Sequence, residues 1–123
     1  LSGEIVRPDQ VLGPKRSGRK ISYVTDTAYM PSIAKEVQGS DLLFCEGMFD
    51  EQYKDQALEK KHMTAIQAGT IARDAKVKKM AMIHYSPRYT DNELKLLLTE
   101  AQSVFTNTVL SRDRMVFEVP YED

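Results

Sequence analysis

Four residues of this chain have side chains that commonly bind metals or move protons, and each falls near a predicted loop. Asp26, Glu46 and His84 each follow an apolar run that predicts a buried strand, and His62 precedes a predicted helix. In a parallel α/β sheet, functional groups gather outside the carboxyl ends of the strands. An aspartate, a glutamate and two histidines would therefore supply the chemistry of a metal site with an acid–base pair.

Each of these residues, taken alone, also has a plainer interpretation. Asp26 could be a turn or capping aspartate, and Glu46 could be a solvated loop carboxylate. His62 could cap the helix that follows it, and a lone histidine such as His84 is more often structural. The occurrence of all four at loop positions of one small unit favours a functional site.

The segments that would position these residues alternate between strand and helix patterns. Strands are predicted at residues 21–24, 41–45 and 80–83, with further short ones at 4–7 and 116–119. Helices are predicted at 31–39, 50–61, 65–75 (with Thr64 as its N-cap) and from Thr90 to about Ser103. Residues 1–19 are predicted to form an irregular N-terminal segment. This alternation predicts an α/β layered unit with largely parallel strands.

The composition limits the possible classes of protein. A length of 123 residues allows one domain or part of one, and 41% hydrophobic residues against 28% charged is typical of a soluble globular chain. The net charge of −1 argues against autonomous nucleic-acid binding, and no apolar run approaches the roughly 20 residues of a membrane span. The single cysteine, Cys45, fits a reducing cytosol. The first residues contain neither a signal peptide nor an initiator Met, so we expect a start inside a longer protein.

Three stretches, in order, resemble the C-terminal motifs of ribonuclease Z, a family of the metallo-β-lactamase superfamily that processes tRNA 3′ ends. They are Gly-Arg-Lys-Ile-Ser-Tyr-Val-Thr-Asp-Thr at 18–27, His-Met-Thr-Ala at 62–65 and His-Tyr-Ser-Pro-Arg-Tyr at 84–89. Leu-Leu-Phe-Cys-Glu at 42–46 lies correctly between the first two, and the resemblance runs from about residue 12 to residue 118. It implies that residues 1–123 form a single partial domain, the C-terminal half of an αββα sandwich.

The resemblance also implies a role for each candidate residue. Asp26 corresponds to the aspartate that bridges two metal ions, which are zinc or alternatively manganese, and His84 to a ligand of the second ion. His62 and Glu46 correspond to a pair near the scissile phosphate, in which the carboxylate orients an imidazole that stabilises charge or protonates the leaving 3′ oxygen. The metal ions would activate a water for attack on the phosphorus. Two residues are expected on the phosphate side of the site, Arg88 and Thr64.

The chain departs from the family pattern in two places. Residues 45–48 read Cys-Glu-Gly-Met where the family commonly has His-Glu-Ala-Thr, so the glutamate is kept in changed surroundings. The superfamily's His-x-His-x-Asp-His motif and a further histidine ligand are not in this chain, which contains only two histidines. Two-metal catalysis needs both ions held in fixed geometry, so we expect the chain alone to be inactive.

The resulting expectation is part of a zinc-dependent, cytoplasmic endoribonuclease that removes 3′ trailers from precursor tRNA. Its partners would be the precursor tRNA, the missing N-terminal half and a second copy in a homodimer, with no membrane. Without its other half, one face of the sheet should be exposed. Two alternatives remain open: a metal-dependent phosphodiesterase or other hydrolase of the same superfamily, and a non-catalytic α/β interaction module.

Overall fold

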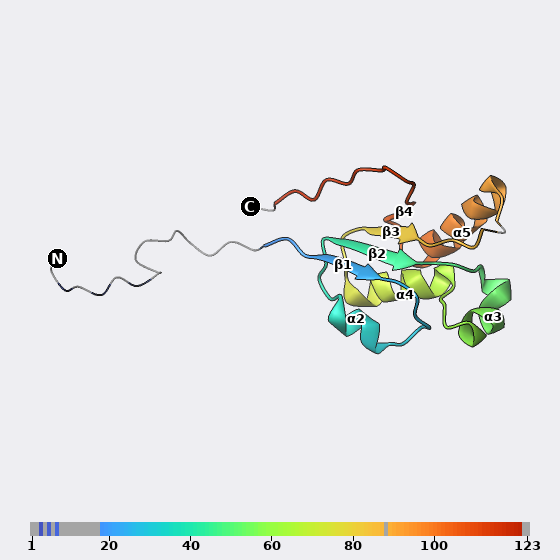
Figure 1. Ribbon diagram of the computed structural model, residues 1–123, viewed down its shortest axis with the longest axis horizontal. Coiled ribbons are helices and arrows are strands. Elements are labelled where there is room, and N and C mark those ends of the chain that lie inside the picture. The colour runs from blue at the N-terminus through green and yellow to red at the C-terminus, as the bar shows by residue number, and fades with distance from the viewer. Residues whose placement is uncertain (1–2, 4, 6, 8–17, 88, 122–123) are drawn as a thin grey trace.

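A four-stranded parallel sheet forms the centre of the structure. The computed structural model describes residues 3, 5, 7, 18–87 and 89–121. The strands are β1 (Ile21–Val24), β2 (Leu42–Glu46), β3 (Met80–Ile83) and β4 (Thr108–Leu110), which lie side by side in this order (Figure 1). All neighbouring pairs are parallel. The predicted α/β class and the parallel arrangement are confirmed.

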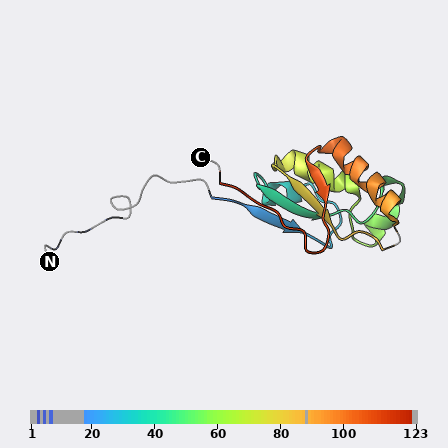
Figure 2. The same cartoon turned by 90° about the horizontal axis from the view of Figure 1, so that it is seen from above.

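Helices cover one face of this sheet. They are α2 (Ser32–Glu36), α4 (Ala65–Ala75) and α5 (Asp91–Val104). A 3-10 turn at Glu51–Tyr53 leads into α3 (Lys54–Glu59), which lies beyond the carboxyl ends of the strands (Figure 1). Figure 2 shows α4 and α5 on the same side of the sheet. Both begin at a threonine that closes a capping box, Thr64 with Gln67 and Thr90 with Glu93. The predicted N-cap at Thr64 and the predicted bounds of the helix at 65–75 are confirmed.

The core lies between the sheet and these helices. Leu43, Cys45, Met80 and Met82 point from the two central strands into it and are fully buried. The α4 side facing them consists mainly of small residues, which allow a close approach of the helix to the sheet and to α5. The tightest place is Gly69, where a Cβ atom would lie 2.9 Å from the carbonyl oxygen of Ala101 in α5.

No helix of the described residues covers the opposite face of the sheet. Phe44 of β2 packs there against Tyr23 of β1 and, edge to face, against Phe117, with ring centroids 5.8 and 5.4 Å apart. Phe117 belongs to the segment after β4, which returns along this side of the sheet (Figure 2). Ile21 and Tyr23 remain 58% and 67% exposed. The apolar side chains of this face are thus covered only in part.

The structure corrects several predicted elements. The strand predicted at 116–119 is wrong: side-chain exposure alternates there as in a strand, but the segment packs Phe117 onto the sheet face and lies in no strand. The fourth strand is Thr108–Leu110 instead. The helix predicted at 50–61 is divided at Tyr53 (φ −103°, ψ 25°) into the 3-10 turn and α3, which ends at Glu59 ahead of Lys61 with its positive φ of 59°. At 4–7, residues 5 and 7 have no regular structure and residues 4 and 6 lie outside the described part.

No helix among the described residues combines the length and the apolar character needed to cross a membrane.

A candidate metal and acid–base site

The carboxyl ends of β1, β2 and β3 bring the predicted site residues together. The register places Val24 beside Cys45 and Glu46 beside Ile83, so the three strands end at one edge of the sheet. Asp26 and His84 follow the ends of β1 and β3, and Glu46 is the last residue of β2. This convergence follows from the parallel register.

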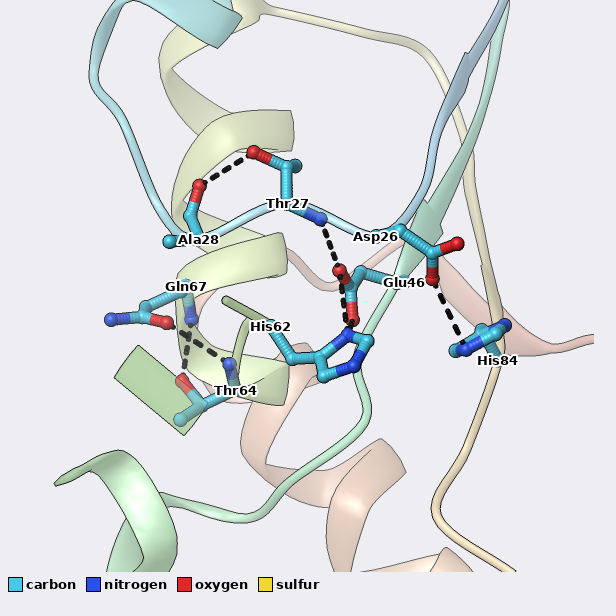
Figure 3. Close-up of polar contacts among 8 residues, drawn as sticks. All are labelled: Asp26, Thr27, Ala28, Glu46, His62, Thr64, Gln67 and His84. Carbon is cyan, nitrogen blue, oxygen red and sulfur yellow. Dashed lines mark hydrogen bonds and ion pairs between the residues drawn. The ribbon is translucent and has the colours of Figure 1, made fainter. Parts of the chain in front are cut away.

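Asp26, His62 and His84 form a group that could hold a metal ion. One ligand atom from each residue lies within 4.8 Å of the other two, and it is the one such group of three among the residues described. The Oδ1 of Asp26 lies 3.2 Å from Nε2 of His84, and the two imidazole rings stack with centroids 5.8 Å apart (Figure 3). Two imidazole nitrogens and a carboxylate oxygen are ligands that zinc accepts, so the donor set fits such an ion.

Glu46 is a fully buried carboxylate with two partners. Its Oε2 lies 3.0 Å from Nδ1 of His62, and its Oε1 accepts a 2.8 Å hydrogen bond from the backbone N–H of Thr27 (Figure 3). Because an ionised carboxylate can only accept, this geometry assigns the proton of the imidazole to Nδ1. The other nitrogen of His62, Nε2, is then left for a metal ion or a substrate atom.

A short β-like pairing holds the His62 loop in place. Phe49, after β2, bridges to Thr64, and its carbonyl accepts the N–H of Ala65 at 2.9 Å. The N–H of His62 itself donates to the carbonyl of Ala57 in α3 at 2.8 Å. The His62 side chain is only 19% exposed, whereas those of Asp26 and His84 are 64% and 45% exposed. The histidine beside Glu46 is therefore set back, and the other two residues face outward.

Left-handed backbone conformations cluster at this edge. Five described residues other than glycine have a positive φ, among them Asp26 (48°) and His84 (60°). A third, Lys61 (59°), directly precedes His62. Such a conformation costs roughly 1–3 kcal/mol for a residue with a side chain and is concentrated at functional sites. Each of the three loops at this edge therefore has a strained residue that is, or directly precedes, one of the site residues Asp26, His62 and His84.

Burial shifts the pKa of two further groups near the site. It raises the pKa of Tyr85 to about 12, so the hydroxyl stays protonated and donates to the carbonyl of Met82. This bond anchors the chain directly after His84. Burial also raises the pKa of the Cys45 thiol, which fits a core thiol rather than a nucleophile.

Of the two residues predicted on the phosphate side, Thr64 lies in the described part of the structure. Arg88 lies outside the described residues. Thr64 is fully buried, and its hydroxyl accepts the N–H of Gln67 at 3.1 Å and donates to Glu51. That hydroxyl is therefore already occupied as a helix cap. A phosphate contact by Thr64 stays a prediction.

Comparison with known proteins shows the family. A sequence model of the beta-lactamase superfamily domain matches residues 11–85. The chain belongs to the β-lactamase superfamily. It is 62% identical over 121 residues to "Ribonuclease Z" of Treponema denticola and 39% identical over 121 residues to "Ribonuclease Z" of Archaeoglobus fulgidus. Each alignment covers 98% of this chain and 39% of the relative, so the chain spans about two fifths of their length. The expected resemblance to ribonuclease Z is confirmed.

Solved structures of the superfamily have the same fold. The metallo-beta-lactamase fold protein YhfI from Bacillus subtilis superposes with a TM-score of 0.68 at 28% identity, over 78% of this chain and 38% of that protein. Human tRNase Z, short form, superposes with a TM-score of 0.55 at 28% identity, over 71% of this chain and 27% of that protein. The expected metallo-β-lactamase type of fold is therefore confirmed.

Sequence reasoning predicted the four side chains that the structure brings together but missed a backbone group beside them, the amide of Thr27. An amide donor leaves no mark in residue type, and only the preceding motif position at Asp26 pointed to this loop.

Proposed function

We propose that this chain is the C-terminal part of a zinc-dependent endoribonuclease that removes 3′ trailers from precursor tRNA. The observation that carries the proposal is the meeting of Asp26, His62 and His84 at the carboxyl edge of the sheet, with Glu46 behind the imidazole of His62. The similarity to proteins named ribonuclease Z, over nearly all of this chain, supports precursor tRNA as the substrate.

Asp26 and His84 would hold the metal ions in this proposal. When bound, the ions supply Lewis-acid activation of water and neutralise phosphate charge. The exposed side chains of both residues leave room for an ion and for a substrate phosphate. A carboxylate between two cations suits Asp26, because it has two oxygens and a full negative charge.

His62 would serve the leaving group. Its Nδ1 is fixed by Glu46, so its Nε2 is the atom that could hold a proton for the leaving 3′ oxygen, which becomes the 3′ hydroxyl of the tRNA. The pair would thus act as an oriented general acid.

The rest of the protein would complete the site. Within the described residues only this one group of three donors lies close enough to hold a metal, whereas two ions in fixed geometry need more ligands. The half-covered sheet face with exposed Ile21 and Tyr23 is a surface on which a second half could pack. We therefore propose that the chain is inactive alone and works with an N-terminal half, in a cytoplasmic homodimer.

The experiment is cleavage of a precursor tRNA carrying a 3′ trailer, by a protein of the relatives' length that contains this sequence. Asp26→Ala should reduce cleavage at least about a thousandfold, since several kcal/mol of transition-state stabilisation would be lost. Asp74→Ala, which removes an exposed aspartate of α4 that pairs with Arg73, is the matched control and should cleave normally.

Other outcomes would redirect the assignment. Metal-dependent hydrolysis of a small phosphodiester without tRNA cleavage would indicate a different hydrolase of the superfamily. Cleavage that survives Asp26→Ala would refute the proposed metal site at its central residue. A protein without metal and without hydrolysis would indicate a non-catalytic module.

A further inference from the structure

The side chain of Asp26 makes few contacts that could fix its position. Its side chain is 64% exposed, and among the described residues its polar contact is with His84, itself 45% exposed. The backbone of Asp26 is left-handed, with φ at 48°, which is a conformation that an aspartate adopts at a cost. An interaction other than those of the Asp26 side chain must therefore stabilise the conformation of the loop after β1.

Glu46 accepts a hydrogen bond from the next backbone amide, that of Thr27. The N–H of Thr27 donates to Oε1 of Glu46 at 2.8 Å, and Glu46 lies in the fully buried last position of β2. A hydrogen bond to a buried carboxylate is stronger than one between neutral groups. The donor is one peptide unit from Asp26, so the bond fixes the orientation of the peptide that follows the aspartate.

We infer that Glu46 is a positioning residue for the metal-binding loop, acting on Asp26 through the Thr27 amide as well as on His62. The inference rests on the proposed metal site. One carboxylate would then set two separate functional groups: Oε1 accepts from the loop that carries Asp26, and Oε2, 3.0 Å from Nδ1 against 3.3 Å for Oε1, is the nearer partner that fixes the tautomer of His62. A rigid strand end connects them, so the metal ligand and the acid keep a constant spacing.

The two contacts can be separated by substitution. In Glu46→Gln the Thr27 N–H can only donate, so the amide oxygen must face Thr27 and the NH₂ group must face His62. The loop contact is kept, while Nδ1 of His62 becomes an acceptor. In Glu46→Met the side chain keeps a similar length and neither contact survives.

The experiment measures zinc affinity by competition with a chromophoric chelator, in the protein of the relatives' length, together with hydrogen exchange of the Thr27 amide. Glu46→Gln should bind zinc within about threefold of the parent and keep the amide protected. Glu46→Met should lose about 10–100-fold in affinity, as for other residues that orient metal ligands, and its amide should exchange faster.

Two results would overturn the inference. One is a folded Glu46→Met variant with unchanged zinc affinity. The other is a Glu46→Gln variant that loses tenfold or more while its Thr27 amide stays protected, since the loss would then come from His62. If the parent protein binds no zinc, the proposed function fails at the metal site itself, which is a different outcome from either of these.

Discussion

Replacement of Thr64 by alanine should reveal whether this residue acts as a helix cap or contacts a phosphate. Its hydroxyl accepts the N–H of Gln67 at 3.1 Å, and Oε1 of Gln67 accepts the N–H of Thr64 at 3.0 Å. Loss of an N-cap hydroxyl costs about 1 kcal/mol, with a range of roughly 0.5–2. The bond from the hydroxyl to Glu51 is 3.3 Å long and reaches a half-exposed carboxylate, so it adds little.

Serine at the same position is the matched control. It keeps the hydroxyl and removes one buried methyl group, which costs about 0.8 kcal/mol by itself. Alanine lacks both groups. The difference between Thr64→Ala and Thr64→Ser therefore isolates the cap and should be about 1 kcal/mol in the free energy of unfolding, measured by urea denaturation.

Precursor-tRNA kinetics at a temperature where both variants are folded complete the test. A capping role predicts the same KM for the alanine and serine variants. The reasoning would be refuted by a stability difference below about 0.3 kcal/mol together with a clearly higher KM for the alanine variant, because the hydroxyl would then act on the substrate.

Three further predictions concern the frame of the site. Gly69→Ala should destabilise by about 1 kcal/mol in a urea melt, because the Cβ atom would lie 2.9 Å from the Ala101 carbonyl and the crowding exceeds the gain in helix propensity. Glu100→Gln should raise the melting temperature at pH 7: burial raises the pKa of Glu100, so its charged form is disfavoured in the fold. That advantage should fade as the pH falls through the raised pKa towards 4.5, the ordinary value, since the parent then takes up a proton on folding and gains stability. Lys61→Gly should be more stable than Lys60→Gly by about 1–2 kcal/mol in denaturant titrations, because Lys61 has a φ of 59° and Lys60 one of −88°. Equal free energies of unfolding for Lys61→Gly and Lys60→Gly would argue against backbone strain at Lys61.

The sequence contains strong signals for the central elements and weak ones for the rest. The strands at 21–24 and 80–83 and the helix at 65–75 were predictable to the residue, because apolar runs and a capping box are local features. The burial predicted for the strand at 21–24 was wrong, because β1 lies at the edge of the sheet with Ile21 and Tyr23 exposed. The strand at 108–110 has only three residues, too few for a periodic pattern. At 116–119 the alternation was real, but only tertiary packing decides whether such a segment pairs with a strand or lies on a sheet face.

For the site, residue type predicted which side chains meet but not how they are held. Acidic and imidazole groups at strand ends were recognisable, because parallel strands end at one edge. The bond from the Thr27 amide to Glu46 was not, since every residue but proline has such a donor. The 5.8 Å stacking of His62 on His84 depends on the pairing of Phe49 with Thr64, which joins segments that no local signal connects.

The strained loops and the buried carboxylate have a common physical explanation. Asp26, Lys61 and His84 adopt left-handed conformations that cost each loop stability, so these conformations persist only where neighbouring structure imposes them. The register of the sheet fixes where the loops begin, and Glu46 bonds two of the three loops at the point where they meet: through the Thr27 amide after Asp26, and through the imidazole after Lys61. The third loop is fixed independently, by the Tyr85 hydroxyl on the carbonyl of Met82. The left-handed residues thus destabilise the loops, and the hydrogen bonds at the strand ends stabilise them. This arrangement is expected when the spacing of three reactive side chains matters more than the stability of the segments that carry them.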